Sequence, residues 1–328
     1  MRARVIGISS AAAALFGVLT LGPVATAQAP QNGGGETLPP LEVKTTKLSD
    51  NFYVITGNNC PRVSSCASVG AQIGPDGVFM IDTGSVPDAV PMILAEIRKL
   101  TDRPIKYMVL THVHGDHTAG NETVGKMGAT LLSTANLRKA YAYPAPGANG
   151  QAPPAPPAAG IPSLTYQGRT TVYMNGDAID LVPLPASHTN GDTMIRIPNA
   201  DAIMTGDVFR NLGFPDMNLG SGGTMKGMFD ALAIIIGAAG PNTKIVPGHS
   251  PYSTPFVDRA RVVFFRDMLI VMRDRVQAQI KAGKSLDDIL KMKLYEDYMS
   301  KLTPSPRGSG TPDGMIRQLH SEITSGGL

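Results

Sequence analysis

The sequence is poor in several residue types that would mark particular classes of protein. Trp is absent, aromatic residues make up only 5% of the chain, and 2 of the 328 residues are cysteines. Lys and Arg form no basic block and the formal net charge is only +3, which argues against nucleic-acid binding. The length could supply one or two domains, but the sequence shows no second hydrophobic core, so we expect a single domain.

A hydrophobic run long enough to stay in a membrane is also missing. Residues 6–21 are mostly apolar, but they are few, interrupted by Gly and Ser, and placed between two arginines and a stretch of small residues. This pattern predicts a signal peptide, residues 1–27, cleaved after Ala27 or else after Ala29, with an uncleaved anchor as the other alternative. Cleavage after Ala27 would lower the net charge to +1. We therefore expect a periplasmic or secreted protein without stable membrane insertion, to which charged polymers are not steered.

The two cysteines, Cys60 and Cys66, flank a predicted hairpin loop. Neither lies near the cleavage site, which argues against a lipoprotein. In an exported protein a pair of cysteines is more often bridged than free, so we predict a Cys60–Cys66 disulfide. Because the closed loop is short, the bridge should add only about 2–3 kcal/mol of stability.

Composition divides the chain into segments. Residues 28–40 are rich in Gly and Pro and predict a disordered lead-in. The folded domain is expected at 41–302, followed by a C-terminal tail at 303–328. Within the domain, residues 143–160 form a Pro- and Ala-rich stretch that cannot pack a core and is expected to be a surface insertion. A lid over a functional site is the alternative for this insertion, because long loops inside compact domains are often functional.

Short strands and helices alternate along the domain, which predicts an α/β protein. Residues 43–48, 52–56 and 68–73 have the pattern of antiparallel strands. An amphipathic helix at 87–100 and a strand at 105–110, after an earlier apolar strand, predict a βαβ unit. Later helices are expected at 225–239 and, with Thr254 as the cap and Pro255 in the first turn, at 255–282.

The strongest chemical signal directly follows an apolar strand. His112 and His114 are two residues apart at its end, so their imidazoles should project to the same side. Gly115 allows a sharp turn, after which Asp116 and His117 can point back into the same pocket. Nitrogen and oxygen ligands without a thiolate favour zinc, with iron or manganese as alternatives. A solvated polar loop would also explain the composition, but so many ligand-type residues after a core strand favour a metal site.

The pattern H-x-H-x-D-H at 112–117 resembles the metallo-β-lactamase superfamily. Three later segments are similar to the remaining motifs of that family and occur in the family's order: ASHTNGD at 186–192, TGD at 205–207 and PGH at 247–249. The resemblance covers roughly residues 43–251, and its ordered motifs make it specific. It implies an α/β fold of the four-layer αβ/βα sandwich type.

The resemblance also implies the residues of the site. Asp116 and Asp207 would be the catalytic carboxylates as well as ligands. Asp82, at the end of a buried strand, resembles a carboxylate that orients a ligand histidine, although a turn cap is an equally simple interpretation. Two Zn²⁺ ions are the implied cofactors. The first would be bound by His112, His114 and His188 and the second by Asp116, His117 and His249, with Asp207 as the bridge.

The implied activity is hydrolysis of a cyclic amide or ester in a small-molecule substrate by a metal-bridging hydroxide. β-Lactam hydrolysis is the leading interpretation, because Arg210 could bind a substrate carboxylate and Asn218 resembles a residue near the lactam carbonyl in one branch of the family. A solvated Arg and a turn Asn are the alternatives for these residues. A lactonase or thioesterase is the second interpretation, since Asp207 stands where that branch has Cys. A metal-binding or redox protein is the third. The sequence leaves the oligomeric state open.

Overall fold

Two β-sheets carry the structure, a computed structural model that describes residues 39–60, 66–146, 150–211, 213–302 and 310–328. The predicted signal peptide lies outside the described residues, as does nearly all of the predicted lead-in. Residues 38–328 form one compact unit. No helix in the described ranges is both long and apolar enough to cross a membrane.

The first sheet has seven strands in the order β1-β2-β3-β4-β5-β6-β7. The pairs from β1 to β4 are antiparallel and those from β4 to β7 are parallel. The predicted antiparallel strands and the βαβ unit, formed by β4, α1 and β5, are thereby confirmed. The strands are β1 (Glu42–Lys47), β2 (Phe52–Asn58), β3 (Val69–Gly74), β4 (Gly77–Ile81), β5 (Ile105–Val109), β6 (Thr130–Thr134) and β7 (Leu164–Tyr166).

The second sheet has five strands in the order β12-β11-β10-β9-β8. Its first hairpin turns at Asn175 and Gly176, which both have positive φ angles of 53° and 74°; Asn and Gly tolerate this conformation best. Only β11 and β12 pair in parallel. The strands are β8 (Thr170–Met174), β9 (Asp177–Pro183), β10 (Thr193–Ile197), β11 (Ala202–Met204) and β12 (Lys244–Val246).

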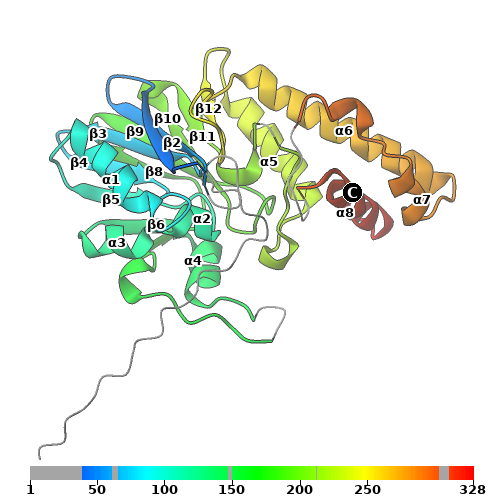
Figure 1. The fold of residues 1–328 in the computed structure, drawn as a ribbon, viewed down its shortest axis with the longest axis horizontal. Coiled ribbons are helices and arrows are strands. Elements are labelled where there is room, and N and C mark those ends of the chain that lie inside the picture. The colour runs from blue at the N-terminus through cyan, green and yellow to red at the C-terminus, as the bar shows by residue number, and fades with distance from the viewer. Residues whose placement is uncertain (1–38, 61–65, 147–149, 212, 303–309) are drawn as a thin grey trace, which may run out of the picture. The chain divides into compact units, whose positions relative to one another are not determined.

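Helices cover the outer face of each sheet (Figure 1). Helices α1, α3 and α4 pack on the first sheet, and α5, α6, α7 and α8 share a core with the second. Helix α2 carries part of the site instead. The helices are α1 (Ala89–Leu100), α2 (Gly115–Thr118), α3 (Asn121–Lys126), α4 (Ala135–Ala142), α5 (Met225–Ala238), α6 (Arg259–Lys281), α7 (Leu286–Lys291) and α8 (Pro312–Thr324).

Three hydrophobic cores separate the layers, because neighbouring residues of a strand point to opposite faces. Phe79 in β4 lies in the core between the two sheets, whereas the next residue, Met80, lies in the core beneath α1. In the second sheet Met204 faces the first sheet, and the preceding Ile203 faces α5 and α6. Central strands such as β4 and β11 are therefore buried on both faces, and the predicted four-layer αβ/βα sandwich is confirmed.

Helix α6 begins later than the sequence pattern predicts. Its cap is Asp258, whose side chain accepts a hydrogen bond from the backbone of Arg261, and neither Thr254 nor Pro255 lies in the helix. The reason is tertiary, since Val257 makes two backbone hydrogen bonds with Ile245 of β12. That pairing keeps the segment extended until residue 258.

The last helix, α8, lies in the segment that the sequence analysis assigned to a tail. Its side chains Met315, Ile316 and Leu319 are fully buried in the core of α5 and α6. The Glu322 carboxylate accepts hydrogen bonds from the backbone nitrogens of Met225 and Lys226, at 2.6 and 3.0 Å. Such acceptors stabilise the unpaired N–H groups of a helix start, so α8 supports the N-terminus of α5.

Two smaller features match the sequence analysis. Cys60 and Cys66 are linked by a disulfide, as predicted. The described part of the insertion at 143–160 contains only a single turn of 3₁₀-helix, Ala158–Gly160, which packs on α3. The side chain of Asn121 donates a hydrogen bond to the Gly160 carbonyl. A role as a lid stays a prediction.

Candidate metal centre

The predicted ligands come together at the ends of strands from both sheets. β5 ends at Val109, and His112 and His114 follow in the next loop. The short helix α2 then presents Asp116 and His117. His188 follows β9, Asp207 follows β11 and His249 follows β12. The location agrees with the general rule that α/β folds place their sites beyond the carboxyl ends of strands.

The structure divides these residues into two candidate metal-binding groups. In each group one ligand atom per residue lies within 4.8 Å of every other. The carboxylate of Asp207 reaches toward both, because it is 3.2 Å from His117 Nε2 and 3.8 Å from His188 Nε2. The first group is His112, His114 and His188, and the second group is Asp116, His117, Asp207 and His249.

Each histidine of the first group has one ring nitrogen next to a neutral neighbour. His112 Nδ1 lies 3.1 Å from Thr111 Oγ1, and His188 Nδ1 donates to the carbonyl oxygen of Asp216 at 2.5 Å. His114 Nε2 lies 2.7 Å from the amide nitrogen of Asn218. The other ring nitrogens face one another, with His114 Nδ1 and His188 Nε2 only 2.8 Å apart. The Thr111 hydroxyl and the Asp216 carbonyl can accept the Nδ1–H of His112 and His188, which fixes each ring and leaves its second nitrogen for a metal, whereas the amide nitrogen of Asn218 contacts His114 as a donor.

The second group is supported by a buried carboxylate. Asp82 Oδ2 lies 2.7 Å from His117 Nδ1, and Asp82 also accepts hydrogen bonds from the backbone nitrogen and the hydroxyl of Thr111. This geometry is that of a carboxylate orienting a ligand histidine. Nearby, His249 Nε2 lies 3.0 Å from Asp116 and 3.4 Å from Asp207.

The two groups have opposite electrostatic properties. Burial, followed by the neighbouring histidines, holds the pKa of His112 well below its usual value and lowers that of His114 to about 4. Burial acts in the same direction on His117 and His249, but the carboxylates around them outweigh it. The pKa of His117 is therefore raised well above its usual value, and that of His249 is raised to about 9.

The carboxylates of the second group respond in the complementary way. Burial alone would raise the pKa of Asp207, but His249 and His117 hold it well below its usual value. Asp116 behaves similarly, since burial raises its pKa and the same two histidines lower it below the ordinary range. Without a metal, the second group is thus a set of carboxylates paired with protonated imidazoles.

Three buried atoms indicate that the site fits a cation. His112 Nε2, His117 Nε2 and Asp207 Oδ1 are shielded from solvent and form no hydrogen bond of regular geometry among the described residues; the last two lie 3.2 Å apart as an ion pair, whereas His112 Nε2 has no such neighbour. A buried polar atom without a partner costs about 1–3 kcal/mol, so such atoms rarely gather without a reason. Lone pairs that converge from imidazoles and a carboxylate are the ligands that zinc and other first-row metals accept.

One glycine makes the approach of the last motif to Asp207 feasible. A Cβ atom at Gly248 would overlap Asp207 Oδ1 and lie 2.6 Å from the backbone of Gly206. Close packing therefore requires glycine at position 248. The next residue, His249, can then lie beside the carboxylate of Asp207.

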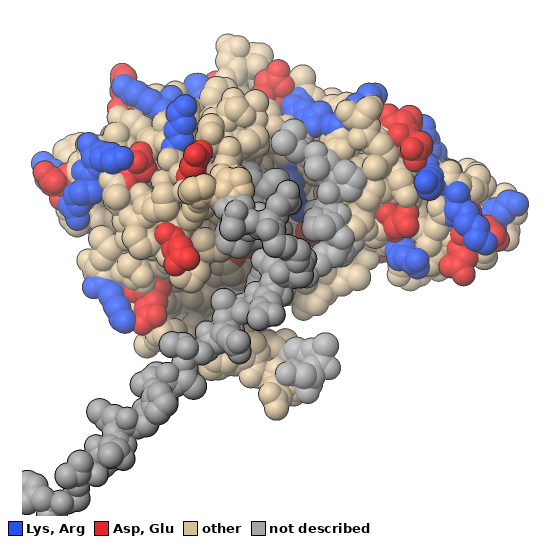
Figure 2. Space-filling model, in the orientation of Figure 1, with Lys and Arg blue, Asp and Glu red and all other residues tan. Residues whose placement is uncertain are grey.

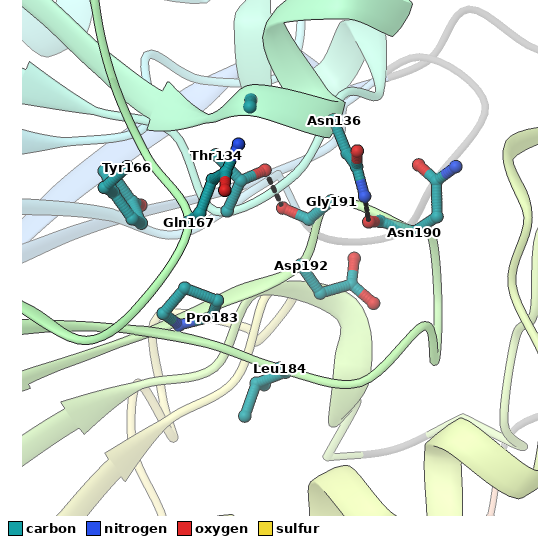
Figure 3. A pocket seen from close by; sticks show the side chains of 10 residues that line it. Thr134, Asn136, Tyr166, Gln167, Pro183, Leu184, Asn190, Gly191 and Asp192 are labelled. Atoms are coloured by element: carbon teal, nitrogen blue, oxygen red, sulfur yellow. Dashed lines mark hydrogen bonds between the residues drawn. The ribbon is translucent and has the colours of Figure 1, made fainter.

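The loop that carries His188 is held by a buried acid. Asp192 accepts hydrogen bonds from the hydroxyl of Ser187, the backbone nitrogen of His188, and both the backbone and the hydroxyl of Thr189. Beside this loop lies a cleft of about 310 Å³, also lined by α4 and the end of β7. Figure 3 shows Thr134 and Asn136 on one wall, hydrogen-bonded to the backbone of Gly191 and Asn190 on the other.

The two residues predicted to contact a substrate are arranged differently. Arg210 Nη1 lies 3.3 Å from Asp216 Oδ2, and the two side chains are 17% and 30% exposed. Asn218 lies against His114, and its side-chain oxygen also accepts a hydrogen bond from the backbone of Ser221. Arg210 is thus ion-paired rather than simply solvated, whereas Asn218 has the expected turn role, as the cap of the 3₁₀ turn Leu219–Ser221, beside its contact with His114. Substrate binding by either residue stays a prediction.

Sequence reasoning gave no role to three residues that position the ligands: Thr111, Asp192 and Asp216. Thr111 lies directly before the motif at 112–117, and Asp192 ends the motif at 186–192, four residues after His188, so their spacing was a usable signal. Asp216 acts through its backbone carbonyl, and a backbone atom leaves no trace in the residue type.

Solved structures share this architecture. A metallo-beta-lactamase from Pontibacter korlensis superposes with a TM-score of 0.54 and 17% identity, covering 69% of this chain and 99% of that one. A double mutant of the sec-alkyl sulfatase PisA1 gives 0.59 and 15% identity, covering 86% of this chain but only half of that one. VMB-1 gives 0.53 and 20% identity over 69% of this chain and 95% of that one. At these identities the likeness shows the fold alone.

Sequence comparison gives the family. A linear primary-alkylsulfatase from a Pseudomonas species is 48% identical over 46 residues, which are 14% of this chain and only 9% of that protein. Residues 61–249, more than half of the chain, match the family model described as the metallo-beta-lactamase superfamily. The matched region ends at the last predicted ligand, His249. The chain therefore belongs to the metallo-beta-lactamase superfamily.

Proposed function

We propose that the protein is a dinuclear zinc hydrolase that cleaves a cyclic amide or ester, with β-lactams as the leading substrate class. The observation that carries the proposal is the direction of the ring nitrogens in the first group. Three separate neighbours hold one nitrogen of His112, His114 and His188, and the opposite nitrogens converge. A second group of ligand-type residues, which includes Asp207, lies beside them. The Asp207 carboxylate lies 3.2 Å from His117 of its own group and 3.8 Å from His188 of the first group.

In this proposal some residues bind the metals, and one of them also transfers protons. Two bound ions would supply a polarised scissile carbonyl and a water of lowered pKa. His112, His114 and His188 would hold the first, and Asp207 would lie between the two. Asp116 differs from Asp207 in access, because its side chain is 32% exposed against 6%. Asp116 is therefore the carboxylate that can both bind a metal and exchange a proton with a substrate from the open side.

Asn218 remains the candidate substrate donor in a β-lactamase. Its amide lies beside His114, and would therefore be close to a carbonyl held by the first metal group. The substrate is a small molecule in this proposal. Figure 2 supports that choice, since positive and negative side chains are interspersed among the described residues on the face in view, which does not favour a charged polymer there.

An alkyl sulfate ester is the second candidate substrate. The sec-alkyl sulfatase structure covers 86% of this chain, whereas the metallo-beta-lactamase from Pontibacter korlensis covers 69%. The sulfatase structure thus also matches a part of this chain that the lactamase structure does not cover, and this supports a sulfate ester as a candidate substrate. Lactones and thioesters remain the other alternative, because a bridging Asp207 resembles the hydrolases of that kind.

We also propose that the protein is exported and cleaved after Ala27. The Cys60–Cys66 disulfide supports an oxidising compartment, since such bridges are rare in the cytosol. The intact mass of the purified protein reports both the cleavage site and the bridge. A mass that includes residues 1–27, or two thiols that react with an alkylating agent without reductant, would contradict export.

The test of function is a metal analysis of the purified full protein together with a turnover screen. The screen should contain a β-lactam, a homoserine lactone, a thioester and a secondary alkyl sulfate. We expect two zinc ions per chain and hydrolysis of the β-lactam. One ion or none would contradict the dinuclear assignment. Two ions with turnover of another substrate alone would overturn the substrate and leave the hydrolase.

A further inference from the structure

Residues 210, 211 and 213–218, which we call the clamp loop, follow Asp207 in the chain and return to the first group of histidines. The carbonyl oxygen of Asp216 accepts the hydrogen bond of His188 Nδ1. Two residues later, the backbone nitrogen of Asn218 donates to the carbonyl oxygen of His188 at 2.8 Å, and its side chain touches His114. The clamp loop therefore contacts two of the three histidines of the first group.

An ion pair closes this loop on itself. Arg210 stands near its start and Asp216 near its end, and their side chains meet at 3.3 Å while largely shielded from solvent. Two further residues of the loop, Phe214 and Met217, are buried in the hydrophobic core, with 0% and 1% of their surface exposed. Arg261 of α6 also donates hydrogen bonds to the backbone and side chain of Asn211.

We propose that Arg210 is a positioning residue whose ion pair with Asp216 aims His188 at the first metal. The inference rests on the proposed function, since it needs a metal at His112, His114 and His188. A backbone carbonyl goes where its residue is held, and the Asp216 side chain is held by Arg210. The pair thereby fixes the ring of His188 with Nε2 toward the other ligands.

This role differs from the predicted binding of a substrate carboxylate. Asp216 already supplies Arg210 with a negative partner, which weakens the attraction of the guanidinium for a second anion. The two roles make opposite forecasts for Asp216→Asn. If Arg210 binds substrate, the substitution frees the guanidinium and should lower KM for substrates with a carboxylate. If Arg210 positions His188, the substitution should weaken metal binding.

The experiment is a cobalt titration of the full chain in an Asp116→Ala background, in which only the first group keeps all its ligands. Visible absorption of Co²⁺ reports both affinity and coordination geometry. Arg210→Ala and Asp216→Asn should each weaken binding about tenfold or more, as the loss of a ligand's orienting partner does elsewhere. The double variant should be no weaker than either single one, because the two residues act as a unit. Arg210→Lys should recover part of the loss.

A matched control is Arg169→Ala, which breaks the ion pair with Asp180 in the second sheet and should leave the cobalt titration unchanged.

With Asp116 intact, Arg210→Ala should lower kcat for charged and neutral substrates alike. Unchanged cobalt affinity in Arg210→Ala or Asp216→Asn would overturn the proposal, and a KM rise restricted to carboxylated substrates would assign Arg210 to substrate instead. A parent protein that binds no cobalt would overturn the proposed function itself. Arg210→Lys and Asp216→Asn keep the size of the side chains, so they serve if Arg210→Ala does not fold.

Discussion

The two ligand groups lie side by side, yet they are built on opposite principles. The histidines of the first group contact neutral partners: a hydroxyl, a backbone carbonyl and an amide. His117 in the second group contacts the carboxylate of Asp82, and two further carboxylates complete that group. The same residue type therefore has a lowered pKa in one group and a raised pKa in the other.

The difference bears on how each group takes up a metal. Near neutral pH the lowered pKa values of His112 and His114 keep these two imidazoles unprotonated, so a cation that binds them does not compete with an added proton. His117 and His249 in the second group are protonated and paired with carboxylates, so a cation must replace those protons. The protonated histidines stand in for the metal's charge and let the carboxylates remain buried. The second group is thus charged and pre-assembled, whereas the first is neutral and held by its neighbours.

The largest effect is expected when one ligand residue is removed from one group at a time, which tests whether the two groups bind metal separately. We expect His188→Ala to lose the ion of the first group and Asp116→Ala to lose that of the second. Each should lower turnover by several orders of magnitude with the fold retained, because each removes a metal ligand. Metal analysis and circular dichroism beside the rate measurement check this. Near-normal rates with metal still bound would remove that residue from the site.

The pH dependence of the metal-free protein should separate the groups. His114 has a pKa of about 4, below its unfolded value of 6.5, so stability should fall as the pH drops from 6.5 toward 4. His249 has a pKa of about 9, so the stability that it adds below pH 6.5 should be lost as the pH rises toward 9. Each effect is about 3 kcal/mol at most. Urea unfolding of chelator-treated protein from pH 4 to 9 measures both.

Single substitutions assign the two sides of that curve. His114→Asn should flatten the acidic side alone, and His249→Asn the alkaline side alone. If either variant changes both sides equally, the groups are coupled and the division into a neutral and a charged group fails.

The support of the second group offers a smaller test. Asp82→Asn keeps the shape of the side chain but removes the charge that orients His117. We expect metal affinity of the second group to fall about 10–100-fold, with a smaller fall in the first, because Asp82 also holds Thr111, the neighbour of His112. Competition with a chelator measures the two affinities. Asp177→Asn is the matched control, because Asp177 is a buried carboxylate in the β8–β9 hairpin and should leave both unchanged.

The sequence predicts the residues of the two candidate groups far better than the residues that hold them in place. His112, His114, Asp116 and His117 are close in the chain and follow one strand, so local periodicity and turn chemistry were enough to bring them together. Asp216 is 28 residues from His188 and contributes a main-chain atom. Its role depends on how the clamp loop packs between α6 and the second sheet, which no local pattern contains.

The fold shows the same division between local and tertiary causes. The layers follow from strands with apolar residues on both faces, which the sequence displays. The start of α6 does not follow from the sequence pattern. Backbone pairing between Val257 and Ile245 keeps this segment extended, although Thr254 and Pro255 are favourable for a helix start. Helix α8 was also missed, since its apolar residues are few and acquire meaning only against α5 and α6.

The hydrogen bonds of Glu322 to the first turn of α5 have a consequence for the order in which the protein matures. Every predicted ligand precedes residue 250, whereas α8 begins at Pro312. The ribosome therefore releases all the ligands before the helix that closes α5. Thr224, the cap of α5, donates its backbone N–H to Ser187, next to His188. The surroundings of His188 are thus tied through α5 to the last helix, so they are complete only when α8 has docked on α5.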